Sequence, residues 1–267
     1  MDLVARNENT IKDNTLLPNQ EEIRNRVALY KFRSKIDLSD SYYNIKVNLD
    51  YEKYTSFSIL FGQFRTRIIQ QGDYNVSAIM VKAMSHILRP MLRKSVTIYL
   101  DNIFIYFHTW EQHKKELRQL HTILKKNKFY INKSKSPVNL RVMQILRVIL
   151  TEKGLEIDSS KVELISMLPI PKNRKELQEF NGMVIYLSQF LPKLTDIIAL
   201  LTKLAGAIKD LLWIPLHTES FNQIKKLLDL PAILKLLDYE STDPLFLICD
   251  VSQVGVEGWI GQGSTLK

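Results

Sequence analysis

The sequence predicts an α+β fold, in which an antiparallel sheet is covered by helices on one face. Three observations support this class. Short β-type runs alternate with apolar patterns at helical spacing over residues 32–150. A strand–turn–strand signal lies close to residue 100. Capping boxes then introduce a mainly helical segment after Gly154. Strands and helices in this order are typical of helices packed on one side of a sheet.

The first elements are strands. Ser34–Leu38 alternates between polar and apolar residues, and Tyr42–Val47 continues after a polar turn. Phe57–Phe61 and Phe64–Ile69 are further β-type runs, and Gly62-Gln63 between them predicts a hairpin turn.

A helix and a second hairpin follow. Apolar residues recur at helical spacing from Val76 to Met91, which predicts a helix capped by Asn75 or Ser77. Val96–Leu100 and Ile103–Phe107 are strongly apolar runs with a polar turn between them.

The next helix begins at a capping box formed by Thr109 and Gln112. Leu117, Leu120 and Leu124 give it an apolar face. Phe129–Ile131 and Ile145–Leu150 then predict short strands, which complete the sheet.

The pattern changes after Gly154. Ser160 with Glu163 and Asn173 with Glu176 are capping boxes that open two helices, with prolines between them. Residues 194–237 are leucine-rich and predicted to be mostly helical. Leu245–Cys249 is a new strand that ends at Asp250. We therefore place domain boundaries near residues 153 and 205.

Composition narrows the classes of function. The 267 residues are 45% hydrophobic and 24% charged, which is ordinary globular usage. A net charge of +9 favours a polyanionic partner, nucleic acid before membrane, although a solvated basic surface also fits. Cys249 is the single cysteine, which excludes an intrachain disulfide and indicates a reducing, intracellular location in cytoplasm or nucleus. We find no secretion signal and no convincing membrane span.

Two acids are the candidate metal ligands. Asp101 lies in the predicted hairpin turn, and Asp37 lies in the Ser34–Leu38 strand. Carboxylates from two neighbouring strands can bridge two divalent ions about 3.5–4 Å apart, as phosphoryl transfer to a nucleic acid 3′ end requires. Mg²⁺ prefers carboxylate and water oxygens. Because Asp101-Asn102 alone also fits a type I′ turn, the metal site rests on the joint pattern.

The order of several sequence blocks resembles the reverse transcriptase region of the pol polyprotein of gypsy-type LTR retrotransposons. Phe32–Tyr42 resembles the first catalytic block of that family, and Ile98–Tyr106 resembles its Tyr-x-Asp-Asp block. Glu152–Leu155 and Asp158 resemble the entry to its thumb. The resemblance extends over almost the whole chain, from late fingers to the start of RNase H.

This resemblance implies a right-hand polymerase fold. Residues 1–153 would be partial fingers and a palm made of an antiparallel sheet with helices. Residues 154–204 would be a helical thumb, and residues 205–267 the connection and a truncated RNase H-like start. The implied activity is RNA-directed DNA polymerase, with Mg²⁺ as cofactor. The implied partners are an RNA or DNA template-primer and deoxynucleoside triphosphates, and no membrane.

The resemblance also implies roles for individual residues. Asp37 and Asp101 match the metal ligands, and Asn102 stands where the third acid belongs. Tyr42 matches the aromatic residue that packs under the incoming sugar and excludes a 2′-hydroxyl, although a core aromatic fits too. Gln71-Gly72 matches the block that lines the nucleotide pocket. In the last segment, Asp250 matches the first of the RNase H acids.

The departures from the family pattern predict a truncated, diverged copy with weak or lost activity. The family's Pro-Phe-Gly-Leu reads Gln70-Gln71-Gly72-Asp73, and its Leu-Gly-His reads Leu146-Arg147-Val148. We expect the first finger strands to be absent before Met1 and the RNase H domain to stop at Lys267. The alternatives are a catalytically inactive nucleic-acid-binding remnant and an inert scaffold. Primer extension and salt-dependent binding separate the three.

Overall fold

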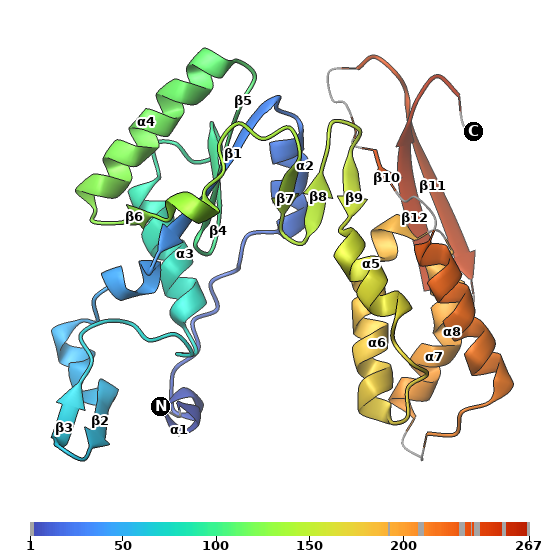
Figure 1. The fold of residues 1–267 in the computed structure, drawn as a ribbon, viewed down its shortest axis with the longest axis horizontal. Coiled ribbons are helices and arrows are strands. Elements are labelled where there is room, and N and C mark those ends of the chain that lie inside the picture. The colour runs from blue at the N-terminus through green and yellow to red at the C-terminus, as the bar shows by residue number, and fades with distance from the viewer. Residues whose placement is uncertain are drawn as a thin grey trace. The chain divides into compact units, whose positions relative to one another are not determined.

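The structure, a computed structural model, describes residues 3–191, 193–207, 211–229, 233–235, 237, 241–252 and 255–265. The chain divides into two compact units, Met1–Arg141 and Val142–Lys267, and each has its own hydrophobic core. Figure 1 shows helices and antiparallel strands in both units, so the predicted α+β class is confirmed.

The first unit is built on a four-stranded sheet with the strand order β4-β5-β1-β6. Its strands are β1 (Phe32–Ser39), β4 (Val96–Tyr99), β5 (Asn102–Phe107) and β6 (Tyr130–Ile131). All neighbouring pairs are antiparallel. Because side chains alternate along a strand, Ser34, Ile36 and Leu38 lie on one face of β1, and Arg33, Lys35 and Asp37 lie on the other.

Helices α3 (Val76–Ile87) and α4 (Trp110–Lys126) pack on the Ile36 face of this sheet (Figure 1). The core between them contains aliphatic and methionine side chains from all three layers, among them Ile36, Met80, Met84, Ile103, Leu120 and Leu124. The predicted capping of α4 is confirmed, because the Thr109 side chain accepts a hydrogen bond from the Gln112 N–H.

The opposite face of the sheet carries Asp37 and is contacted by α2 (Gln20–Ala28) and the residues after it. Gln20 Nε2 donates to Tyr99 Oη at 2.6 Å, and the rings of Tyr30 and Tyr106 lie 4.7 Å apart. Helices on one face and a partly open second face give this sheet a side on which polar residues can meet a ligand.

The remaining elements of the first unit are short: α1 (Val4–Glu8), η1 (Ser41–Asn44), η2 (Leu49–Thr55), β2 (Ser56–Ile59), β3 (Gly62–Arg65) and η3 (Lys133–Lys135). The Tyr42–Val47 strand prediction is wrong, since this stretch begins in η1. The β2–β3 hairpin is present, but its turn is Leu60-Phe61. The cross-strand pair of Phe57 and Phe64, with ring centroids 6.0 Å apart, explains this register.

The second unit begins with the strands β7 (Met143–Ile145), β8 (Val148–Leu150) and β9 (Leu155–Ile157), and β9 also pairs with β10 (Ile233–Leu234). The prediction of one strand at Ile145–Leu150 is wrong, because Leu146 and Arg147 both have positive φ and form a two-residue hairpin turn. At Gly154 an added Cβ would lie 2.3 Å from the carbonyl oxygen of Leu234, so only glycine fits there.

Helices α5 (Ser159–Ser166), α6 (Arg174–Tyr186), α7 (Leu194–Gly206) and α8 (Pro215–Leu228), with η4 (Ser188–Phe190), form the second core. Asn173 caps α6 as predicted. Helix α5 is capped by Asp158 and not by Ser160, because the Asp158 carboxylate accepts from the Ser160 N–H at 3.0 Å. Parts of the predicted helical stretch, residues 208–210, 230–232 and 236, lie outside the described residues.

The last two strands, β11 (Leu245–Ser252) and β12 (Gly255–Gln262), form an antiparallel hairpin. Asp250 lies within β11, opposite Glu257, and not at the end of the strand as predicted. The strand is longer than the apolar run Leu245–Cys249, because pairing with β12 extends it through polar residues.

Candidate functional site

The two predicted acids lie at adjacent strand ends of the first unit. Asp37 of β1 pairs with Asn102 of β5, and Asn102 also pairs with Tyr99 of β4. Asp101 directly precedes Asn102 in the hairpin turn. The register therefore shows that β1, which contains Asp37, is paired with β5, the strand that follows the Asp101 turn. The roles of these residues as metal ligands stay predictions.

The turn that carries Asp101 is formed by Leu100 and Asp101, and not by Asp101 and Asn102 as the sequence predicted. The pair Tyr99–Asn102 closes the hairpin, so Asn102 is the first residue of β5 and its side chain is directed to the Asp37 face. Leu100 has a φ of 56°, a conformation that is costly for a bulky residue. Such strain is frequent at functional sites, which supports a role for this turn.

Hydrogen bonds fix the carboxylate of Asp101 and the backbone of Asp37. Asn102 Nδ2 donates to Asp101 Oδ1 at 2.9 Å. The Asp37 N–H donates to Ser136 Oγ at 2.9 Å, and the Asp37 carbonyl accepts from the Asn132 N–H at 2.9 Å. Within the described residues, no salt bridge reaches Asp37 or Asp101. The backbone of Asp37 is thus fixed, and in the described part of the chain no cation is paired with its carboxylate.

Tyr42 lies in η1 and packs against the core of the first unit. Burial raises the pKa of the Tyr42 phenol, and the negative charge of Asp101 raises it further. The second effect requires the phenol and the carboxylate to be close enough to interact. Tyr42 and Asp101, which are 59 residues apart in sequence, thus interact electrostatically.

Gln71 and Gly72 are the central residues of a tight turn. The Asp73 N–H donates to the Gln70 carbonyl at 3.1 Å, and Gly72 has a φ of 99°, as the third residue of a type II turn requires. The Ile69 N–H donates to the Ile45 carbonyl at 3.1 Å. This contact brings the chain leading into the turn alongside the segment that follows Tyr42.

The donor set fits a hard divalent cation. Asp37 and Asp101 supply carboxylate oxygens, and Asn102 adds an amide oxygen without charge. In the described part of the chain, no group of three or more His, Cys, Asp or Glu side chains could hold a metal ion. Mg²⁺ is often bound by one or two carboxylates, with substrate phosphates and water completing its coordination. Two acids at adjacent strand ends meet that requirement.

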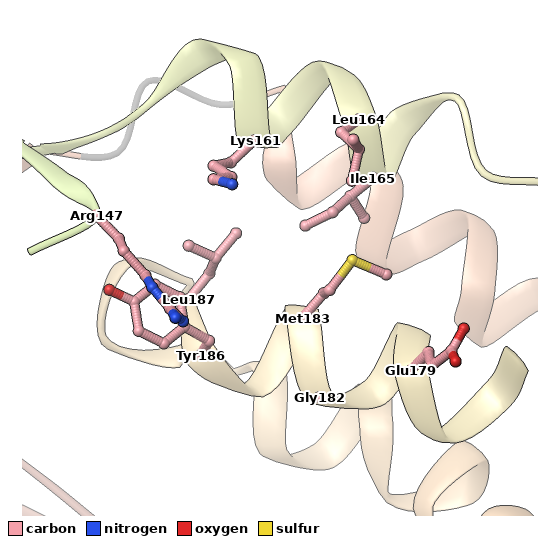
Figure 2. A pocket seen from close by; sticks show the side chains of 9 residues that line it. All are labelled: Arg147, Lys161, Leu164, Ile165, Glu179, Gly182, Met183, Tyr186 and Leu187. Carbon is pink, nitrogen blue, oxygen red and sulfur yellow. The ribbon is translucent and has the colours of Figure 1, made fainter. Parts of the chain in front are cut away.

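The second unit contains an open groove with a volume of about 550 Å³, which was not predicted from the sequence. Figure 2 shows Arg147, from the β7–β8 turn, and Lys161, from α5, beside the groove, with Met183 and Tyr186 of α6 along its floor. The Arg147 guanidinium lies 5.8 Å from the Tyr186 ring centroid, and Tyr186 Oη donates to the Leu146 carbonyl at 3.1 Å. The sequence offered one signal for this groove, because Arg147 occupies a turn position at which the resembled family has glycine.

Both cations of this groove are exposed, and among the described residues neither forms a salt bridge. A guanidinium stacked on an aromatic ring, with an ammonium nearby, suits a phosphate-bearing ligand. Asp250 also belongs to the second unit, whereas the other predicted site residues belong to the first.

The chain matches the sequence profile of the family described as "Reverse transcriptase (RNA-dependent DNA polymerase)" over residues 4–185. It is 27% identical over 257 residues to the retrovirus-related Pol polyprotein from transposon 297 of Drosophila melanogaster, covering 96% of this chain and 24% of that protein. It is 26% identical over 246 residues to the transposon Tf2-7 polyprotein of Schizosaccharomyces pombe, covering 92% of this chain and 18% of that protein. The chain thus spans a quarter or less of these relatives.

Solved structures have the same fold. The foamy viral protease-reverse transcriptase, solved in complex with double-stranded DNA, matches with a TM-score of 0.86 at 22% identity, over 98% of this chain and 46% of that one. The same viral protein in complex with an RNA/DNA hybrid matches with a TM-score of 0.81 at 21% identity, over 97% and 37%. Among the described helices, none has the length and apolar character to cross a membrane.

Proposed function

The chain belongs to the reverse transcriptase (RNA-dependent DNA polymerase) family, and on that premise we propose that it carries out two-metal nucleotidyl transfer with an activity weakened at Asn102. The transposon relatives confirm the resemblance to a retrotransposon Pol polyprotein. The observation that carries the proposal is the pairing of Asp37 with Asn102, next to Asp101. It joins two acids and one amide at one end of the two central strands of the sheet.

In this proposal Asp37 and Asp101 would hold two Mg²⁺ ions, and such ions would supply activation of the primer 3′-hydroxyl and neutralisation of the leaving pyrophosphate. Asn102 orients the Asp101 carboxylate by donating from Nδ2, but it contributes no negative charge. Tyr42 lies under the incoming sugar, and Gln71 and Gly72 line the nucleotide pocket. Positioning of this kind accounts for most of phosphoryl-transfer catalysis.

We assign residues 1–153 to partial fingers and palm, residues 154–204 to a thumb, and residues 205–267 to a connection and RNase H-like start. These segments do not coincide with the two compact units, because β7 and β8 lie before residue 153 but belong to the second unit. In the RNase H-like segment we assign Asp250 to a remnant acidic site.

Primer extension tests the metal site. With Mg²⁺ or Mn²⁺ the unmodified chain should extend a DNA primer on an RNA template slowly, and Asp37→Asn or Asp101→Asn should abolish the extension, since each removes half of the carboxylate charge. The matched control is Asp243→Asn, an exposed acid in the second unit, which should extend like the unmodified chain. Extension that survives Asp37→Asn and Asp101→Asn would exclude this site.

A catalytically inactive nucleic-acid-binding remnant is the second candidate function. The +9 net charge and the two exposed cations of the groove favour it. Under either function the partner is a template-primer duplex of RNA or DNA, by analogy with the duplexes bound in the foamy viral structures. Binding without any metal-dependent extension would support the remnant.

Nucleic acid binding should depend steeply on salt, because neutralised phosphates release counterions. Combining Arg147→Ala with Lys161→Ala should weaken binding to an RNA–DNA hybrid and reduce the slope of log affinity against log salt by about 1–2. Combining Lys203→Ala with Lys226→Ala removes the same charge from exposed sites outside the groove and serves as the control. An equal loss in both double variants would mean that net charge, and not the groove, is responsible.

A further inference from the structure

The N-terminal segment, residues 3–15, is tied by side chains to the turn at residues 70–75, although 62–67 residues separate the partners. We propose that this segment, the N-terminal clasp, positions the Gln71-Gly72 turn for the incoming deoxynucleoside triphosphate, with Arg6 and Asn7 as positioning residues. The inference rests on the proposed function, in which this turn lines the nucleotide pocket.

Arg6 closes the base of the turn. Its Nη2 donates to Gln70 Oε1 at 2.9 Å and also forms a salt bridge with the Asp73 carboxylate. The side chains of Arg6 and Asp73 are only 22% and 24% exposed, so solvent screens this pair less than a surface pair. The other oxygen of Asp73 accepts from the Gln70 N–H at 3.0 Å. One guanidinium thus holds both ends of a turn whose corners are Gln71 and Gly72.

Asn7 holds the far side of the same turn. Its Nδ2 donates to the Gly72 carbonyl at 2.8 Å, and its Oδ1 accepts from the Tyr74 N–H at 2.9 Å. One amide side chain therefore satisfies two backbone groups on either side of Asp73, much as a neighbouring strand would. These two hydrogen bonds set the position of Gly72, a residue with a positive φ.

Further contacts continue the clasp toward α3. Asn75 Nδ2 donates to the Ile11 carbonyl at 2.8 Å, and the Asp13 N–H donates to Asn75 Oδ1 at 2.9 Å. Lys82 Nζ of α3 lies 2.6 Å from Asp13 Oδ2. Hydrogen bonding, above all from Lys82, lowers the pKa of the Asp13 carboxyl to about 2. Asn75 is engaged with the clasp, which explains why its side chain does not cap α3.

The clasp acts next to the predicted catalytic residues. Ile69, just before the turn, is bonded to Ile45, and Ile45 follows η1, which contains Tyr42. The charge of Asp101 in turn contributes to the raised pKa of Tyr42. A shift of the turn would therefore move Gln71 relative to Tyr42 and the acids. A polar clasp fixes that geometry with hydrogen bonds where the turn itself buries few apolar groups.

Hydrogen–deuterium exchange tests the clasp without reference to activity. Arg6→Leu should speed exchange of the amides of residues 70–76 by about tenfold or more, because it leaves the Asp73 carboxylate unpaired. Adding Asp73→Asn should recover part of this protection, because the unpaired charge is removed while an acceptor for the Gln70 N–H remains. Amides of β1 and α4 should be unaffected, which shows that the fold is intact. Unchanged exchange at residues 70–76 in Arg6→Leu would overturn the inference.

Nucleotide affinity provides the second measurement. Titration of the chain and template-primer with dTTP and Mn²⁺ should show at least about tenfold weaker binding for Arg6→Leu and recovery in the double variant. Arg89→Leu, which removes an exposed arginine after α3, should bind like the unmodified chain. Faster exchange in Arg6→Leu with unchanged dTTP affinity would overturn this inference and leave the proposed function standing. Absence of dTTP binding by the unmodified chain would overturn the proposed function as well.

Discussion

The substitution Asn102→Asp is expected to raise metal-dependent primer extension about 10- to 100-fold. Asn102 lies directly across from Asp37 and beside Asp101, so the new carboxylate would join the two existing ones. Charge-assisted contacts contribute about 1.5–3 kcal/mol each, and every 1.4 kcal/mol corresponds to about tenfold in rate. An amide oxygen can contact a divalent ion, but it cannot offset the ion's charge.

The same substitution should make folding stability depend on metal ions. Asn102 Nδ2 now donates to Asp101 Oδ1, and in Asn102→Asp this hydrogen bond is replaced by repulsion between two carboxylates. In the presence of a chelator the variant should therefore unfold at a lower temperature than the unmodified chain. Added Mn²⁺ should raise its unfolding temperature more than that of the unmodified chain, since a ligand that binds the native state stabilises it.

Asn139→Asp is the matched control for both measurements. Asn139 is exposed, and its φ of 58° is compatible with either asparagine or aspartate. This variant should show neither faster extension nor metal-dependent stabilisation. If Asn102→Asp and Asn139→Asp behaved alike, position 102 would not belong to the metal site. Rapid extension by the unmodified chain would contradict the proposed weakening at Asn102.

The parts of the fold that sequence predicted well are those with a periodic pattern. The alternation in Ser34–Leu38 and the helical spacing from Val76 to Met91 both reflect burial on one face, which the core of the first unit confirms. Turns were placed less well. Phe57–Phe64 pairing moved one turn by two residues, and the positive φ values of Leu146 and Arg147 created a hairpin where one strand was predicted.

The candidate site likewise contains residues that the sequence predicted and contacts that it did not. Asp37 and Asp101 were predicted to be neighbours because each ends or joins an apolar run, and strand pairing then brings them together. The N-terminal clasp was not foreseen, since contacts such as Arg6–Asp73 and Asn7–Gly72 join polar residues that follow no period. Contacts between distant polar side chains depend on the assembled fold, and local sequence carries no signal for them.

Acid should destabilise the first unit through His113 of α4. This side chain is fully buried; its Nε2 lies 2.7 Å from Ser34 Oγ, and its Nδ1 has no partner among the described residues. Burial lowers the pKa of His113 from 6.5 to about 4. Ser34 Oγ already accepts from the Asn139 N–H, so its own hydroxyl hydrogen is available to donate to His113 Nε2. A proton on Nε2 would remove the acceptor and break this hydrogen bond.

The sign of the effect follows from proton binding. Above pH 6.5 the histidine is neutral in both states, and its full contribution to stability is present. As the pH falls from 6.5 toward 4, the unfolded chain binds a proton that the folded chain excludes, so the free energy of unfolding decreases. The loss should be on the order of 2 kcal/mol at pH 5, where most other groups have not yet changed charge.

Urea unfolding at several values between pH 7.5 and 5 measures this loss. His113→Leu should be less stable than the unmodified chain at pH 7.5, because the Ser34 hydroxyl loses its partner, but its stability should change much less with pH. His121→Leu alters an exposed histidine of the same helix and should keep the pH dependence of the unmodified chain. An equal pH dependence in His113→Leu and the unmodified chain would show that other groups take up the proton. Because Ser34 lies in β1 three residues before Asp37, the loss of this contact in acid also loosens the strand that carries the candidate metal ligand.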